Sequence, residues 1–246
     1  MKKVVRRCGT VVCVVLLAAV GYGQSKGDSG RFGIGVKGSL LGGGVEGAVR
    51  VTHHTNLRAG FNIFDYSRGF NKDGVAYNGQ LSFKTVEAHY DIFPFAGAFH
   101  LSPGVLVYAA TPVTATANIP NNQSFSLGGT TYISGSPAVT GSGNIKFNQA
   151  APMATIGWGN LVPRKASKHI SVPVELGVAF QGSPKASLNL AGNVCDPGPT
   201  GPTNCRAIAS DSTVQANILS EQTKLNNSMR FFKMYPIISV GFGYKF

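Results

Sequence analysis

A histidine and a serine stand two positions apart at two places in this chain, as His100 with Ser102 and as His169 with Ser171. An imidazole that reaches a hydroxyl can act as its general base, and an acidic partner would complete an arrangement for nucleophilic catalysis. The segment HHTN at 53–56 is a second candidate, because imidazole nitrogens bind metal ions. Its composition is that of a solvated turn, which we favour over a metal site. Whether either set can do chemistry depends on the elements that carry it.

The segment GIGVKG at 33–38 matches the dinucleotide-binding pattern GxGxxG. That pattern binds pyrophosphate where a strand precedes it and a helix N-terminus follows it. Neither element is indicated here, and the chain contains 32 glycines, so we interpret the match as chance. We therefore predict no metal site and no cofactor.

Alternation of apolar with small or polar residues recurs along the chain, and this period of two is typical of strands. In the fourth such run the apolar residues Leu81 and Phe83 stand at odd-numbered positions, whereas Val86 and Tyr90 stand at even-numbered ones. We therefore expect either a bulge near Lys84 or a stretch that stands clear of the main sheet. The alternating runs lie near 32–36, 45–51, 57–63, 76–92, 101–107, 154–158, 169–180 and 235–246.

The connections between these runs alternate in length. Short turns follow the second, fourth and sixth runs, whereas longer segments follow the third, fifth and seventh; the short first connection is an exception. An even number of strands with short turns at one rim predicts an all-β fold, an eight-stranded antiparallel up-and-down transmembrane β-barrel. The last long segment would contain a short amphipathic helix at about 206–227, with Val214, Ile218 and Leu225 on one face. Residues 111–143 would be hairpin extensions or a mobile loop.

The first 23 residues differ in kind from the rest. Four basic residues precede an apolar run from Thr10 to Val20, and Gly21-Tyr22-Gly23 follows, as in a secretory signal. The apolar run is about half as long as a membrane-spanning helix. We predict a signal peptide at 1–23, cleaved after Gly23 or alternatively after Ala19, and one barrel domain at 24–246. Cleavage lowers the formal net charge from +12 to +8, because it removes four basic and no acidic residues.

Export also bears on the partners and on the cysteines. Only 13% of the residues are charged, and no Lys/Arg cluster is interleaved with aromatics, so we predict no nucleic-acid partner. Cys195 and Cys205 flank the loop DPGPTGPTN. An exported pair with this spacing predicts a disulfide.

The last residues, SVGFGYKF, combine Ser239 and Gly241 with the aromatics Tyr244 and Phe246. This ending resembles the C-terminal signal of bacterial outer-membrane proteins, and the whole predicted domain resembles small OmpA/OmpX/OmpW-like barrels. The resemblance implies recognition by the barrel-assembly machinery and an integral position in the bacterial outer membrane, surrounded by lipid, as a monomer.

Such barrels include enzymes that resemble lipid A deacylases and use a histidine and a serine two apart. In this chain both His/Ser pairs begin strands that leave short turns, so they would lie at the periplasmic rim and point inward. That position disfavours a lipid-modifying enzyme, whose site would be near the outer leaflet.

The non-apolar face of the strands is rich in small residues with nearly balanced charge, which suits a narrow interior better than a solvated exterior. Charges enclosed by lipid must be paired or hydrated. If they interlock, they plug the barrel; if water separates them, they line a narrow path for small solutes. We favour the plug and predict a non-enzymatic envelope-structural or surface-interaction role, with a narrow pore as the alternative. The predicted interior residues are Lys37, Glu46, Arg50, Arg58, Glu87, His89, Asp91, Glu175 and Lys233, together with Lys245.

Overall fold

The computed structural model describes residues 30–246 except 73–74, 111–112 and 166. The predicted signal peptide at 1–23 lies outside the described residues. The strands are β1 (Phe32–Ser39), β2 (Gly42–Arg50), β3 (Thr55–Lys72), β4 (Val75–Ile92), β5 (Phe99–Tyr108), β6 (Val113–Ile119), β7 (Ser124–Leu127), β8 (Thr130–Ser134), β9 (Val139–Lys146), β10 (Ala150–Trp158), β11 (Ile170–Ser171), β12 (Val174–Phe180), β13 (Lys185–Ala191), β14 (Asn193–Gly198), β15 (Gly201–Ala207) and β16 (Met234–Lys245). The helical segments are η1 (Ile208–Ser210), α2 (Ser212–Ser228) and η2 (Met229–Phe231).

Eight antiparallel strands close into a barrel, which confirms the predicted fold class. Its order is β1, β2, β3, β4, β5, β10, β12 and β16, and β16 pairs back onto β1 with Ile34 opposite Tyr244. The predicted seventh strand is two pieces, β11 and β12, separated by Val172 and Pro173. Proline lacks the N–H that a central strand position would donate.

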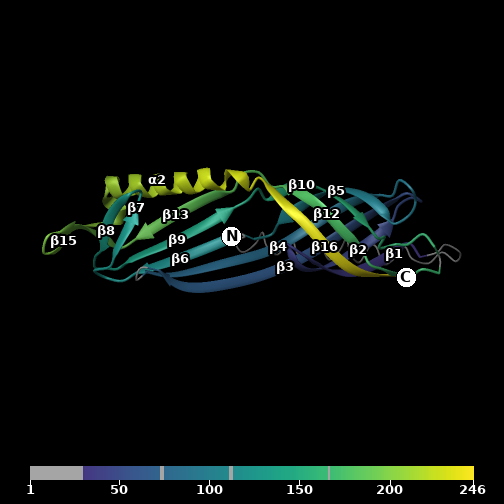
Figure 1. The fold of residues 1–246 in the computed structure, drawn as a ribbon, viewed down its shortest axis with the longest axis horizontal. Coiled ribbons are helices and arrows are strands. Elements are labelled where there is room, and N and C mark those ends of the chain that lie inside the picture. The colour runs from purple at the N-terminus through teal and green to yellow at the C-terminus, as the bar shows by residue number, and fades with distance from the viewer. Residues whose placement is uncertain (1–29, 73–74, 111–112, 166) are drawn as a thin grey trace, which may run out of the picture.

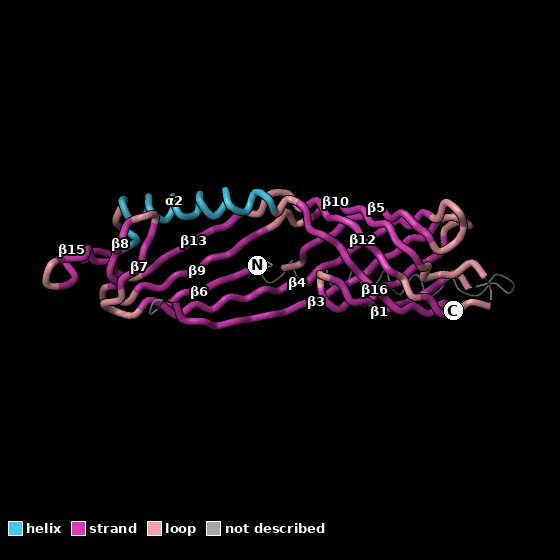
Figure 2. Tube along the Cα trace, viewed as in Figure 1, coloured by secondary structure: helices cyan, strands magenta, loops and turns pink. Residues whose placement is uncertain are grey.

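The barrel occupies one end of an elongated molecule, and an extension of its wall forms the other end (Figures 1 and 2). The two 18-residue strands β3 and β4 run through both parts. The barrel part of β4 pairs with β5 from Thr85 onward, whereas residues 76–81 pair with β6, and the sheet continues through β9 to β13. The β3–β4 register is unbroken, so the expected bulge near Lys84 is absent. The first part of β4 extends beyond the barrel, as the alternative expectation had it, but it remains paired within the same sheet.

The side of the wall that is apolar reverses between the two parts. In the barrel the buried side chains of β3 are polar, including Arg58 and Asn62, whereas Leu57, Phe61 and Ile63 face outward and are exposed. On β4 the buried row changes from Asp91, His89 and Glu87 to Phe83 and Val75 without a change of parity. The extension thus has an apolar interior and a polar outer face, which explains why the sequence changes parity at Leu81.

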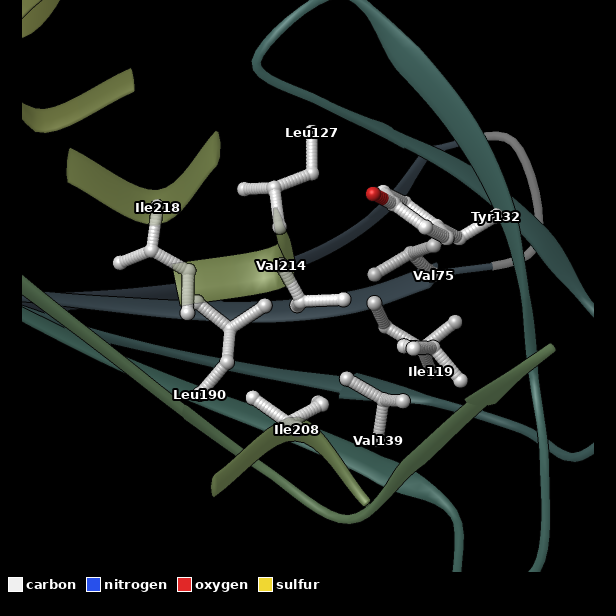
Figure 3. Close-up of a cluster of buried hydrophobic side chains, with 10 residues drawn as sticks. Val75, Ile119, Leu127, Tyr132, Val139, Leu190, Ile208, Val214 and Ile218 are labelled. Atoms are coloured by element: carbon white, nitrogen blue, oxygen red, sulfur yellow. The ribbon is translucent and has the colours of Figure 1, made fainter. Parts of the chain in front are cut away.

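The interior of the extension is a cluster of buried apolar side chains from strands and helices far apart in the sequence (Figure 3). Tyr132 from β8, Val139 from β9 and Leu190 from β13 meet Ile208 from η1 and Val214 from α2. This cluster shows that residues 113–146 form hairpins packed into the extension, which was one of the two expectations for this region.

Helix α2 covers the free edge of β13. The side chains of Gln222 and Asn226 accept hydrogen bonds from the backbone N–H groups of Leu188 (3.2 Å) and Ala186 (2.8 Å). These donors would otherwise have no partner strand. Leu225, predicted on the apolar face, is 41% exposed, because the helix packs through Val214 and Ile218.

The start of α2 is stabilised by charge and hydrogen bonding. Asp211 caps the helix by accepting a hydrogen bond from the N–H of Val214 at 2.8 Å, which lowers the pKa of its carboxyl group. Arg206 binds Asp196 (2.9 Å) and Asp211 (2.7 Å), and these partners, Asp196 foremost, raise the pKa of its guanidinium group.

The predicted disulfide is present. Cys195 and Cys205 are bonded across the β14–β15 hairpin, in a small sheet with β8 and β7. Arg206 therefore ties the base of this hairpin to the start of α2.

The extension should unfold before the barrel when its core is weakened. Replacing the fully buried Ile208 with alanine should destabilise the extension by about 2–5 kcal/mol. In limited proteolysis of the detergent-folded protein, we expect Ile208→Ala to be cut faster within 113–146 and 185–228 while the barrel strands persist. Leu219→Ala is the control, because Leu219 is 61% exposed. Equal resistance of Ile208→Ala and the wild type would contradict this assignment of the core.

Candidate functional site: the barrel interior

Arg58 is the centre of the barrel interior. Its Nε and Nη2 donate to Asp91 at 3.1 and 3.0 Å, and its Nη1 donates to Glu46 at 3.0 Å and to Glu175 at 3.2 Å. Nη2 makes a further, short contact with Glu175. The guanidinium fork thus holds three carboxylates from three other strands at once, and all four side chains are buried.

Lys37 forms a second cationic point beside Arg58. Its Nζ lies 3.6 Å from Glu46 and makes a short contact with Glu87. Asn62 adds hydrogen bonds to Glu87 at 3.4 Å and to Thr85 at 3.2 Å. Glu46 is shared by Lys37 and Arg58, so the two cations belong to one network.

Two hydroxyl groups and an imidazole complete this network. Ser102 donates to Asp91 at 2.7 Å, His100 Nε2 lies 3.0 Å from Glu175, and Ser239 donates to Glu175 at 3.4 Å. Four carboxylates face only two permanently charged cations here, and each of these three groups adds a contact to a carboxylate oxygen of Asp91 or Glu175 that Arg58 also binds. Sequence reasoning treated His100 and Ser102 as a catalytic candidate and missed this role; their place in the inward row of β5 was the available signal.

The glycines of the inward rows make room for these side chains. A Cβ atom at Gly157 would lie 2.8 Å from His100 Nε2 and 2.9 Å from Glu175 Cγ. Any larger residue would therefore displace the His100–Glu175 pair.

The His/Ser pairs are not arranged for catalysis. His100 and Ser102 bind different carboxylates, Glu175 and Asp91, so the imidazole is not placed as a base for the hydroxyl. His169 Nδ1 lies 3.0 Å from the carbonyl oxygen of Lys245. The buried hydroxyl of Ser171 has no hydrogen-bond partner in the part of the chain that is described.

The other predicted interior residues lie in different surroundings. His89 is buried, with Nε2 3.7 Å from Glu87. Arg50 is half-buried at the last residue of β2. The structure places Lys233 outside the barrel, exposed in the turn before β16, because that strand begins only at Met234. Lys245 is buried at the opposite end, where its Nζ donates to the carbonyls of residues 163 and 165 at 3.0 and 2.8 Å.

The connection between β10 and β11 closes one end of the barrel. Leu161 and Val162 are buried against Ala48, and Asn56 donates to Asn160 at 2.9 Å. Arg164 donates to Asn56 at 3.0 Å, and its guanidinium carbon lies 5.0 Å from the centre of the Phe93 ring. In the short turn that follows the sixth predicted run, Lys165 and Lys168 are exposed, whereas residues 160–163 are buried.

An apolar layer closes the other end. Leu41 from the β1–β2 turn meets Phe83, Leu106, Met153 and Ile237, and all five are buried. Above this layer, Tyr108 donates to Gln181 at 2.5 Å, and Gln181 donates to the carbonyl oxygen of residue 232 at 3.0 Å. The ion-paired network thus lies between two closures.

These features define the molecule as a closed eight-stranded antiparallel barrel with an apolar outer surface and an ion-paired interior. No protein-family model and no curated protein matches the sequence. Among solved structures the chain is similar to Acinetobacter baumannii CarO2, with 21% identity, a TM-score of 0.50, and coverage of 87% of this chain and 98% of that one. It is also similar to A. baumannii CarO, with 20% identity, a TM-score of 0.48, and coverage of 87% and 97%. At this identity the likeness to CarO2 shows the fold alone. Within the described ranges, no helix combines the length and apolarity needed to span a membrane.

Removing Arg58 should destabilise the barrel strongly, because buried carboxylates would lose their charge partner. We expect Arg58→Met to lower the free energy of unfolding by about 3–5 kcal/mol. Adding Asp91→Asn and Glu175→Gln should recover most of the loss, because two of the three carboxylates that lost Arg58 are then neutral and Glu46 keeps Lys37 as its partner.

The measurement is urea unfolding in detergent, followed by the fluorescence of Trp158, the one tryptophan of the chain. Lys168→Met at the exposed turn is the matched control. An Arg58→Met variant as stable as this control would show that the network does not support the barrel.

Proposed function

We propose that this protein is an integral outer-membrane β-barrel with a non-enzymatic role, in which a plugged barrel anchors a rigid external extension for surface interaction. The observation that carries this proposal is the change along β4 of the buried row, from Asp91, His89 and Glu87 to Phe83 and Val75. A wall that is apolar outside in one part and polar outside in the next suits lipid around the first part and water around the second.

The outer surface of the barrel supports the membrane position. Its exposed side chains are large and apolar on every strand, and all edges are paired, as a spanning sheet requires. In water such a continuous surface would be an aggregation hazard. Representative exposed residues are Val36, Val45, Phe61, Tyr90, Leu101, Trp158, Leu176, Val240 and Phe242.

The closing seam supports assembly as a bacterial outer-membrane protein. Ser239 points inward to Glu175, whereas Tyr244 and Phe246 are exposed on the outer face with ring centres 5.4 Å apart. Phe246 donates its N–H to the carbonyl of Phe32 at 3.1 Å, and their ring centres are 6.1 Å apart. A C-terminal strand recognised by the assembly machinery would therefore also close the barrel, with the short turns toward the periplasm.

The interior supports a structural role over transport or catalysis. The carboxylates of the network pair directly with Arg58 and Lys37, and Leu41 and Leu161 belong to the two closures. His100 and Ser102 are occupied by that network. The extension, with its polar outer face and disulfide-bearing hairpin, is the part available to a surface partner.

A plugged barrel should not conduct. We expect the mature protein, refolded and inserted in a planar bilayer, to give no steady single-channel conductance, and Glu87→Gln should remain silent. Slower gel migration after boiling than before it gives proof of folding. Steady conductance that changes in Glu87→Gln or Arg58→Ala would instead favour the narrow pore.

The seam residue Phe246 should matter for assembly more than for stability. We expect Phe246→Ser to reduce the amount in the outer-membrane fraction several-fold, while the purified variant refolds in detergent with nearly the wild-type urea midpoint. Phe180→Ser is the control, since Phe180 is also exposed on the outer face but lies at the opposite end of the barrel. Equal losses for both variants would argue against a special role of Phe246.

A further inference from the structure

We infer that the rim where the barrel meets the extension binds the phosphate groups of lipid headgroups through Lys146, Lys185, Arg230 and Lys233. This inference rests on the proposed membrane position. All four side chains are exposed, and none has an ion-pair partner among the described residues.

The first observation is a cross-strand pair of like charge. Lys185 begins β13 directly opposite Lys146, which ends β9. Like charges at directly opposite positions destabilise a sheet. The nearest cation on α2, Lys224, is paired with Glu221 at 3.7 Å, so that carboxylate is already engaged. A bound anion would relieve the repulsion between the two lysines.

The second observation is the sequence Arg230-Phe231-Phe232-Lys233, which joins α2 to β16. Phe231 is 91% exposed and Phe232 is 62% exposed, more than most apolar side chains of the barrel surface. Two aromatic rings between two cations match an interface in which acyl chains lie beside charged headgroups.

Hydrogen bonds hold these two groups on the same part of the rim. Gln181 donates to the carbonyl oxygen of Phe232 at 3.0 Å, and Asn226 accepts from the N–H of Ala186 at 2.8 Å. The segment that contains Lys185 is therefore fastened at both ends to the segment that contains Arg230 and Lys233.

The position along the barrel selects a lipid as the occupant. Phe180 of β12 is opposite Met234 of β16, and both are exposed apolar residues at the end of the outward rows. Lys233 directly precedes Met234, so the cations begin where the lipid-facing surface ends. A lipid can place its phosphate group on the cations and its acyl chains along the apolar surface. A free phosphate ion would contact only the cations and would leave Phe231 and Phe232 unpartnered.

The test compares two lipids that differ only in the headgroup. Native mass spectrometry of the detergent-folded mature protein gives dissociation constants for phosphatidic acid and for phosphatidylcholine with the same acyl chains. We expect tighter binding of phosphatidic acid, and weaker binding as salt rises. The double variant Lys146→Gln/Lys185→Gln should bind phosphatidic acid roughly tenfold more weakly, since each lost cation weakens binding by about fivefold or less. Its affinity for phosphatidylcholine should not change.

A structural role alone would not give this pattern. Without lipid, the double variant should be at least as stable to urea as the wild type, because the like-charge pair is removed. Lys165→Gln/Lys168→Gln, at the exposed turn of the opposite rim, is the matched control and should keep wild-type binding.

The inference would be overturned if the protein bound the two lipids with equal affinity, or if the control variant lost as much affinity for phosphatidic acid as Lys146→Gln/Lys185→Gln. It would also be overturned if inorganic phosphate, at the same concentration as the lipid, displaced the lipid completely. Insertion into vesicles is measured in parallel. A protein that inserts but does not distinguish the lipids refutes only the headgroup site, whereas one that does not insert refutes the proposed membrane function and this site with it.

Discussion

The buried charges of the barrel interior are the constraint on which the rest of the structure depends. Four carboxylates and two cations removed from water are stable only if every oxygen and every N–H finds a partner. Arg58 meets this need because its planar fork reaches Glu46, Asp91 and Glu175 together. The neighbouring strands then keep small residues such as Gly157 where the network needs space, and the two closures separate it from the ends.

The extension is built on the same two strands, β3 and β4, but it needs an apolar interior instead of a charged one. Once β3 and β4 leave the barrel, their outward faces become polar and their inward faces need an apolar core. Strands β6, β9 and β13 supply one side of that core, and α2 supplies another while its Gln222 and Asn226 satisfy the last strand edge. The result is a second packed body built from the wall of the barrel, with exposed basic and aromatic residues at the junction.

Much of this arrangement could be predicted from the sequence, for identifiable reasons. Period-two alternation reports which side chains share a face, so the eight barrel strands and the inward position of Arg58 and Glu175 followed from it. Partners across the barrel did not follow, since Arg58 and Glu175 are 117 residues apart and meet only through closure and stagger. Lys233 was assigned inward because its parity matched, but parity has no meaning one residue before a strand begins. Leu161 and Val162 fall in the short turn predicted after the sixth run, and no local pattern indicates that this turn folds back into the barrel.

By itself the sequence determined the all-β class, the number of barrel strands, the inward or outward face of residues within those strands and the cysteine pair, because these depend on local periodicity and short spacing. Only the tertiary structure decided that the interior charges interlock, that both ends are closed, and that β4 changes partner from β5 to β6. Those features depend on contacts between residues distant in the chain, which form only when β16 pairs with β1 and brings all inward rows around one axis.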